Sequence, residues 1–203
     1  DMAENELRKV LTELNIPYYE AEGEAAFYGP KLDVQVKSAI GHDVTLSTCQ
    51  LDFLLPERFE LEYVDEGGKK ERPVVIHRAI LGSLDRFIAF LLEETKGDLP
   101  TWLAPVQVKV IPVSSEHQGE YAKNIELYLK ENGIRVESDL RNEKLGYRLR
   151  EAQTAKIPYT LIIGDQEKEN DTVSYRLHGQ KETTTVSKIE FLNLMKDVID
   201  NKK

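Results

Sequence analysis

The chain changes its pattern of secondary structure near residue 100, and this change limits how it can fold. The stretch from Lys96 to Pro105 contains Gly97 and Pro100, residues that interrupt helices and strands. Before this stretch, short alternating segments are separated by tight turns, whereas after it strands alternate with long helical segments. We therefore expect two domains, residues 1–98 and residues 99–203.

The first part has the pattern of an antiparallel sheet with flanking helices. Apolar residues at a helical spacing predict its first and last helices, and alternation of apolar and polar residues predicts its strands. Such a mixture is typical of an α+β fold. The expected helices are residues 4–15 and 84–95, and the expected strands are residues 18–19, 32–37, 44–53, 59–64 and 74–77.

The second part has the pattern of a three-layer α/β domain. Its strands and helices follow one another in turn, an order that predicts a largely parallel sheet covered by helices on both faces. The expected strands are residues 106–113, 134–140, 159–164, 173–177 and 183–186, and the expected helices are residues 116–132, 143–156 and 188–201.

The composition limits the class of protein. Of the 203 residues 40% are hydrophobic, which is adequate for packed cores, and no apolar run is long enough to cross a membrane. A single cysteine, Cys49, excludes an internal disulfide, and the acidic start of the sequence is unlike a signal peptide. These features predict a cytoplasmic protein with no membrane partner.

Charge is distributed unevenly along the chain. The net charge is −9, and the first 100 residues hold 11 Lys and Arg against 20 Asp and Glu, whereas the remainder holds 16 of each. An acidic protein neutralises few phosphates, so it binds nucleic acid poorly through charge alone. Any RNA contact is therefore expected to be local and to lie in the second half.

The segment from Pro73 to Glu94 joins a β-branched run to a helical pattern that contains Arg86 among apolar neighbours. An arginine held in apolar surroundings needs an anionic partner, and its planar guanidinium suits a triphosphate. The alternative is an amphipathic helix whose arginine extends into water. The residues alone leave both interpretations open.

Four stretches bear a family resemblance. The string Gly82–Phe87 resembles motif 3 of the class II aminoacyl-tRNA synthetases, whose arginine, here Arg86, contacts ATP. The longer string His77–Ser83 is similar to that of the threonyl-tRNA synthetase family, as are residues 25–31, 50–53 and 100–105. The resemblance covers nearly the whole chain. It implies an α+β part of the class II catalytic domain followed by an α/β three-layer anticodon-binding domain.

The resemblance also implies a substrate pocket. Its catalytic residues would be Tyr28, Lys31, Gln50 and Arg86, with ATP and Mg²⁺ as substrate and His77 as one of three zinc ligands. The other two ligands and motifs 1 and 2 would precede residue 1. Without the family, a lone histidine near a strand end is more often structural, and the tyrosine and lysine could belong to an ordinary hairpin.

A further set of residues would read the tRNA anticodon. Single-stranded loops are recognised through splayed bases hydrogen-bonded along their edges. By resemblance the contacting residues would be Asn142, Arg150, Lys156, Glu167 and Arg176. Lys144 and Arg148 share a face of the expected helix 143–156. Without the family resemblance, we interpret that face as solvated.

We therefore expect the C-terminal part of a threonine–tRNA ligase. The parent enzyme would use ATP to activate threonine, transfer it to tRNA-Thr and act as a homodimer. This chain alone is expected to be inactive, with anticodon recognition retained and its own oligomeric state open. The alternative is a non-catalytic tRNA-binding or regulatory module derived from the synthetase.

Overall fold

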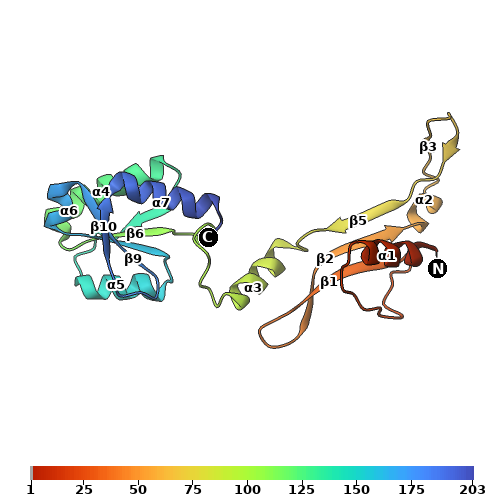
Figure 1. Ribbon diagram of the computed structural model, residues 1–203, viewed down its shortest axis with the longest axis horizontal. Helices are drawn as coiled ribbons and strands as arrows, with labels where there is room; N and C mark the ends of the chain where they lie inside the picture. The colour runs from red at the N-terminus through yellow and green to blue at the C-terminus, as the bar shows by residue number, and fades with distance from the viewer. Residues whose placement is uncertain (1) are drawn as a thin grey trace. The chain divides into compact units, whose positions relative to one another are not determined.

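The computed structural model describes residues 2–203 (Figure 1). The chain forms two compact units, of which the first ends at Glu94 and the second spans Thr95–Lys203. Within the described residues, no helix is both long and apolar enough to cross a membrane. The strands of each unit pair only within that unit among the described residues.

The first unit is built around a three-stranded antiparallel sheet in the order β1-β2-β5. A hairpin turn at Ser38–His42 joins the first two strands, with the Ser38 amide donating to the His42 carbonyl at 2.8 Å. A β-bulge between Val34 and Gln35 shifts the register of the β1–β2 pairing. The elements are α1 Met2–Glu13, β1 Lys31–Lys37, β2 Asp43–Asp52, α2 Leu54–Arg58, β3 Tyr63–Val64, β4 Lys70–Glu71, β5 Val75–Ala79 and α3 Leu84–Glu94.

Two expected strands of the first unit differ in the structure, and one helix is additional. Residues 18–19 form no strand with any described residue, and the expected strand 59–64 is reduced to β3, which pairs only with the short β4. Helix α2 was not expected. It begins at Leu54 because the Asp52 side chain accepts hydrogen bonds from the Leu54 and Leu55 amides, which satisfies two donors of the first helical turn.

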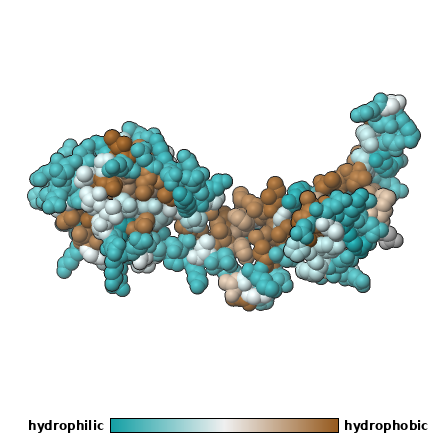
Figure 2. All heavy atoms as spheres, viewed as in Figure 1, coloured by the Kyte–Doolittle hydropathy of each residue, from teal (hydrophilic) through white to brown (hydrophobic). Residues whose placement is uncertain are grey.

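Residues 2–94, the described part of the first unit, contain no buried apolar core. Every buried hydrophobic side chain among residues 2–203 lies between Ala104 and Met195, in the second unit. In the first unit, Ile76 on β5 and Leu84 and Ile88 on α3 are 61%, 71% and 48% exposed. Figure 2 shows hydrophobic atoms at the surface along these elements. The apolar faces that the sequence pattern predicts are therefore formed but not covered.

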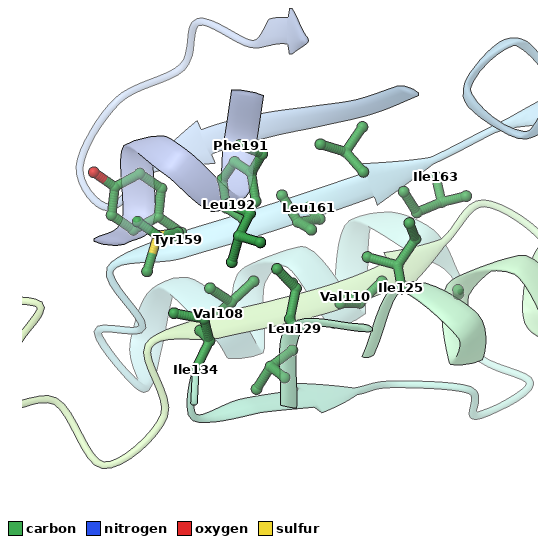
Figure 3. Close-up of a cluster of buried hydrophobic side chains, with 14 residues drawn as sticks. Val108, Val110, Ile125, Leu129, Ile134, Tyr159, Leu161, Ile163, Phe191 and Leu192 are labelled. Atoms are coloured by element: carbon green, nitrogen blue, oxygen red, sulfur yellow. The ribbon is translucent and has the colours of Figure 1, made fainter. Parts of the chain in front are cut away.

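The second unit contains a five-stranded sheet in the order β10-β9-β8-β6-β7. One face carries the larger core, in which Val108, Leu161 and Phe191 are almost fully buried with side chains of α4 and α7 (Figure 3). On the other face Ile111 packs with Ala152 of α5. The elements are β6 Val108–Pro112, α4 Ser115–Glu131, β7 Val136–Ser138, α5 Leu145–Thr154, β8 Tyr159–Ile163, α6 Asp165–Asn170, β9 Thr172–Leu177, β10 Thr184–Ser187 and α7 Lys188–Asp200.

The three layers confirm the predicted α/β fold class, but the sheet is mixed rather than largely parallel. Strand β6 pairs in parallel with β7 and β8, whereas β8–β9 and β9–β10 are antiparallel. The short helix α6 between β8 and β9 was not expected. Because α6 spans only Asp165–Asn170, the chain reverses after β8 and returns as an antiparallel neighbour.

Candidate functional sites

Three of the predicted pocket residues form one row across the sheet of the first unit. Gln50 on β2 lies opposite Lys31 on β1 and opposite His77 on β5. Residues directly opposed on neighbouring strands project from the same face of a sheet. The register therefore brings an amine, an amide and an imidazole together on one face.

Tyr28 joins this row from the loop before β1. Its hydroxyl donates to Oε1 of Gln50 at 2.5 Å, and its ring centroid lies 5.6 Å from that of His77. Main-chain hydrogen bonds hold the loop, because the amides of Leu51 and Phe53 donate to the carbonyls of Pro30 and Tyr28, both at 3.1 Å. Tyr28, Gln50 and His77 thus form one contiguous group.

Lys31 is held by a carboxylate that the sequence analysis did not single out. Its Nζ donates to Oδ2 of Asp33 at 2.7 Å, and this hydrogen bond raises the pKa of Lys31. Burial acts to raise the pKa of Asp33, but hydrogen bonds from Lys31 and from Thr48, at 2.7 Å, outweigh it and lower that pKa. The pair is therefore charged, and the ammonium group is fixed in place.

Asp52 is the second acidic residue that the sequence analysis missed. Its side chain is 0% exposed, and its Oδ2 lies 2.8 Å from Nε2 of His77. Burial acts to raise its pKa, but the hydrogen bonds with His77 and with the Leu55 and Leu54 amides outweigh it and lower the pKa of this carboxyl. The signal was its position two residues after Gln50, on the same face of a strand beside His77.

His77 has the surroundings of a histidine that can serve as a single metal ligand. A metal-binding histidine commonly donates its other ring N–H to a carboxylate, as Nε2 can to Asp52 here. Among residues 2–203, however, no group of three or more His, Cys, Asp or Glu side chains could hold a metal ion. These residues therefore fit one third of a three-ligand zinc site.

Arg86 does not lie in apolar surroundings. It is exposed in the first half of α3, and its amide donates to Oγ of Ser83 at 3.4 Å near the helix start. In the described structure the Arg86 side chain lies at the surface, because α3 contributes no buried residue. A guanidinium on this surface remains free to meet an anionic ligand.

In the second unit, a patch of buried polar atoms lies on the sheet face that α5 covers. Arg176 on β9 lies opposite Thr160 on β8, and His178 follows two residues later. The Gly179 amide donates to Oε1 of Gln153 at 3.2 Å, which joins α5 to the end of β9. Four atoms here are buried with no hydrogen-bond partner among the described residues, namely Gln153 Nε2, Thr160 Oγ1, Arg176 Nε and His178 Nδ1. We call these four residues the α5–β9 polar patch.

The other predicted anticodon residues lie around α5 and α6. Asn142 is exposed in the loop before α5, and Arg150 is exposed on that helix. Lys156 follows α5 with φ 53°, and its Nζ donates to the carbonyl of Lys96. The carboxylate of Glu167 is already engaged, because Oε2 accepts from the Gly164 amide at 2.8 Å and Oε1 accepts from Ser174 Oγ at 2.6 Å. Both carboxylate oxygens of Glu167 therefore already accept hydrogen bonds from residues of the second unit.

Arg148 corrects the interpretation of a solvated basic helix face. It is 2% exposed, whereas Lys144, one turn earlier, is exposed. Its guanidinium donates to main-chain carbonyls rather than to water. Nothing in the sequence distinguished it from its basic neighbours, because charge alone does not reveal which residue meets buried carbonyls.

Comparison with known proteins gives each unit a family. Residues 3–95 match the tRNA synthetase class II core domain (G, H, P, S and T), and residues 107–198 match the anticodon binding domain. Together with the antiparallel sheet and the three-layer domain, these matches define a class II tRNA synthetase segment that joins core and anticodon-binding parts.

Individual relatives narrow the class further. The chain is 57% identical to threonine–tRNA ligase of Oceanobacillus iheyensis over 203 residues, which is 100% of this chain and 31% of the relative. It is also 57% identical to threonine–tRNA ligase 1 of Bacillus subtilis, over 99% of this chain and 31% of the relative. It is similar to a crystal structure of the RNA binding domain of threonyl-tRNA synthetase from Cryptosporidium parvum, with a TM-score of 0.89 and 35% identity over 97% of this chain and 50% of that chain. The chain belongs to the threonine–tRNA ligase family, and it spans about a third of the length of these curated relatives.

Proposed function

We propose that this chain provides the anticodon-reading unit and one side of the active site of a threonine–tRNA ligase. The complete enzyme activates threonine with ATP and Mg²⁺, transfers it to tRNA-Thr and acts as a cytoplasmic homodimer. This proposal extends the family relationship, because the activity and partners of the relatives belong to proteins about three times as long.

The α5–β9 polar patch is the observation that supports anticodon recognition most. Arg176 Nε and Gln153 Nε2 are N–H donors without a partner among the described residues, and the Thr160 hydroxyl can donate or accept. These donors are buried, so a base edge reaches them only by displacing the side chains that cover them, and a donor paired in this way no longer carries the cost of lacking a partner. Asn142, Arg150, Lys156, Glu167 and Arg176 are the proposed contacts, with Arg176 central because it belongs to both sets.

The proposed active-site roles follow from the row across the first sheet. Tyr28 and Gln50 share a hydrogen bond and would position threonine, while Lys31, fixed by Asp33, would place a positive charge near the reacting carboxylate and phosphate. Exposed Arg86 would contact the ATP phosphates. His77 would hold zinc, which when bound supplies a Lewis acid for the amine and hydroxyl of threonine.

The first test of this proposal is a binding titration at fixed salt. The chain is titrated with the anticodon stem-loop of tRNA-Thr and with loops that carry one changed central base. Recognition predicts a loss of roughly 1–3 kcal/mol for each changed base, the scale of a good base-edge contact. Equal, salt-sensitive binding to all loops would mean that the second unit is a generic basic surface.

Arg176→Lys is the informative variant in this titration. It keeps the charge but removes the planar set of donors, so discrimination between loops should fall while the salt dependence stays the same. Lys181→Ala, on the loop between β9 and β10, is the matched control, because Lys181 is exposed and belongs to neither proposed set. Anticodon discrimination that survives Arg176→Lys would remove this residue from the proposed contacts.

A second test concerns catalysis. The described residues provide one zinc-ligand candidate and an exposed Arg86, so we expect no threonine-dependent ATP–pyrophosphate exchange by this chain alone. Exchange at an ordinary enzymatic rate would contradict this expectation. Loop discrimination without exchange is also the behaviour of a non-catalytic tRNA-binding module, and aminoacylation by the full-length protein separates the two.

A further inference from the structure

Asp52 makes two different kinds of contact, one with each carboxylate oxygen. Oδ1 accepts hydrogen bonds from the amides of Leu54 and Leu55, both at 2.9 Å, and Oδ2 lies 2.8 Å from Nε2 of His77. The side chain is 0% exposed. The start of α2 therefore fixes the carboxylate, and the carboxylate in turn contacts only one of the two ring nitrogens of His77.

The chemistry of the two groups determines where the ring proton lies. A neutral imidazole has one N–H donor and one nitrogen with a free electron pair, and a carboxylate can only accept. The nitrogen beside Asp52 must therefore carry the proton. We propose that Asp52 is a positioning residue that selects the Nε2–H tautomer of His77 and leaves the electron pair of Nδ1 available to a divalent metal ion of the zinc type.

The neighbours of His77 support this assignment. Its strand position is set by pairing with Gln50, and the Gln50 amide oxygen is occupied by the Tyr28 hydroxyl at 2.5 Å. The side chain of His77 is 41% exposed, so the buried carboxylate fixes one edge of the ring while part of the ring remains accessible. Carboxylate–histidine–zinc arrangements orient a ligand in this way. The metal in this assignment rests on the proposed function, whereas the tautomer does not.

Asp52→Asn is the decisive substitution because it keeps the shape of the side chain. The amide oxygen of asparagine would retain the two helix-start hydrogen bonds, which turns its NH₂ group toward Nε2 of His77. An NH₂ group can only donate, so Nε2 would have to accept and the ring proton would move to Nδ1. A carboxylate-to-amide change is known to impose the wrong histidine tautomer in the serine-protease triad.

The experiment records the ¹⁵N NMR chemical shifts of the His77 ring in the full chain. The sample is kept at a pH well above the ordinary histidine pKa of about 6.5, so that the ring is neutral. In the unsubstituted chain, Nε2 should have the ¹⁵N chemical shift of a ring nitrogen that carries a proton. In Asp52→Asn, Nδ1 should have that shift instead. Asp65→Asn is the control. Asp65 Oδ1 also accepts from a backbone amide, that of Lys69 at 2.7 Å, but it lies in the exposed β3–β4 turn. This control should retain the Nε2–H tautomer.

Two outcomes would overturn the proposal. One is an Nδ1–H tautomer in the unsubstituted chain, and the other is an Nε2–H tautomer that persists in Asp52→Asn. Contacts between β2 and β5 in the same spectra establish whether the sheet is intact. If Asp52→Asn loses them, Asp52→Ser replaces it, and the second outcome is then a strong Nε2–H preference in Asp52→Ser equal to that of the unsubstituted chain. Anticodon-loop binding is measured separately, so the two proposals can fail independently.

Discussion

Nη1 of Arg148 donates to the main-chain oxygen of Asp139 at 2.9 Å, in the segment that directly follows β7. Nη2 of the same residue donates to the carbonyls of Pro112 and Val113 at the end of β6, at 2.8 Å and 3.2 Å. A single buried guanidinium thus ties α5 to the ends of two parallel strands. Its fixed set of donors suits this task better than a flexible amine would.

Arg148→Lys should therefore destabilise the second unit. A lysine cannot reach three carbonyls in this geometry, and losing hydrogen bonds of a charged group costs about 1.5–3 kcal/mol. Urea unfolding followed by circular dichroism measures the loss. Arg150→Lys, on the exposed side of the same helix, should change the free energy of unfolding by less than about 0.5 kcal/mol. Equal effects of the two substitutions would contradict the structural role of Arg148.

Glu126 should make stability depend on pH in the acid range. Burial acts to raise its pKa, but hydrogen bonds from Lys130, Ser138 and Lys123 outweigh this and lower the pKa to about 2. A carboxyl with a lowered folded-state pKa stabilises the fold above its unfolded pKa, about 4.3, and this contribution disappears as the pH falls toward 2.

Glu126→Gln should remove this contribution. We expect a loss of about 1–3 kcal/mol at neutral pH, with the difference from the unsubstituted chain shrinking below pH of about 4. Denaturant unfolding at a series of pH values provides the measurement. Glu131→Gln, on the exposed end of the same helix, is the control. A constant difference at every pH would show that lost packing, not charge, explains the effect.

The sequence predicted the hairpin from β1 to β2 and the strand–helix alternation of the second unit, because local periodicity determines both. It did not predict α2, because that helix starts where buried Asp52 accepts two backbone amides. It also did not identify Arg148 as buried, because the three carbonyls that accept from it belong to other segments. One lies 9 residues away in the sequence, and the other two lie more than 30 residues away. Tyr28, Gln50 and His77 were named through family resemblance, whereas their arrangement depends on strand register, which composition does not reveal.

The two units should differ in their ability to fold alone. Cut at the proposed boundary, residues 99–203 keep the buried cluster around Val108, Leu161 and Phe191, whereas residues 1–98 keep none of the buried hydrophobic side chains found in the described chain. Hydrophobic burial is the main favourable contribution to folding. We therefore expect a cooperative thermal transition for the second piece and none for the first. A cooperative transition in residues 1–98 would contradict this reasoning.

Gly29→Ala should disrupt the loop that places Tyr28. Gly29 has φ +155°, and a Cβ added there would lie 2.1 Å from the carbonyl oxygen of Leu51. Because that oxygen belongs to β2 backbone, the loop itself must move away. The amides of Leu51 and Phe53, which donate to this loop, should lose protection in hydrogen exchange by at least about tenfold, equivalent to about 1.4 kcal/mol. Gly41→Ala is the control, since Gly41 also has a positive φ, +85°, but a Cβ there meets no atom within 4 Å. Unchanged protection at Leu51 and Phe53 in Gly29→Ala would mean that the loop does not pack closely on β2.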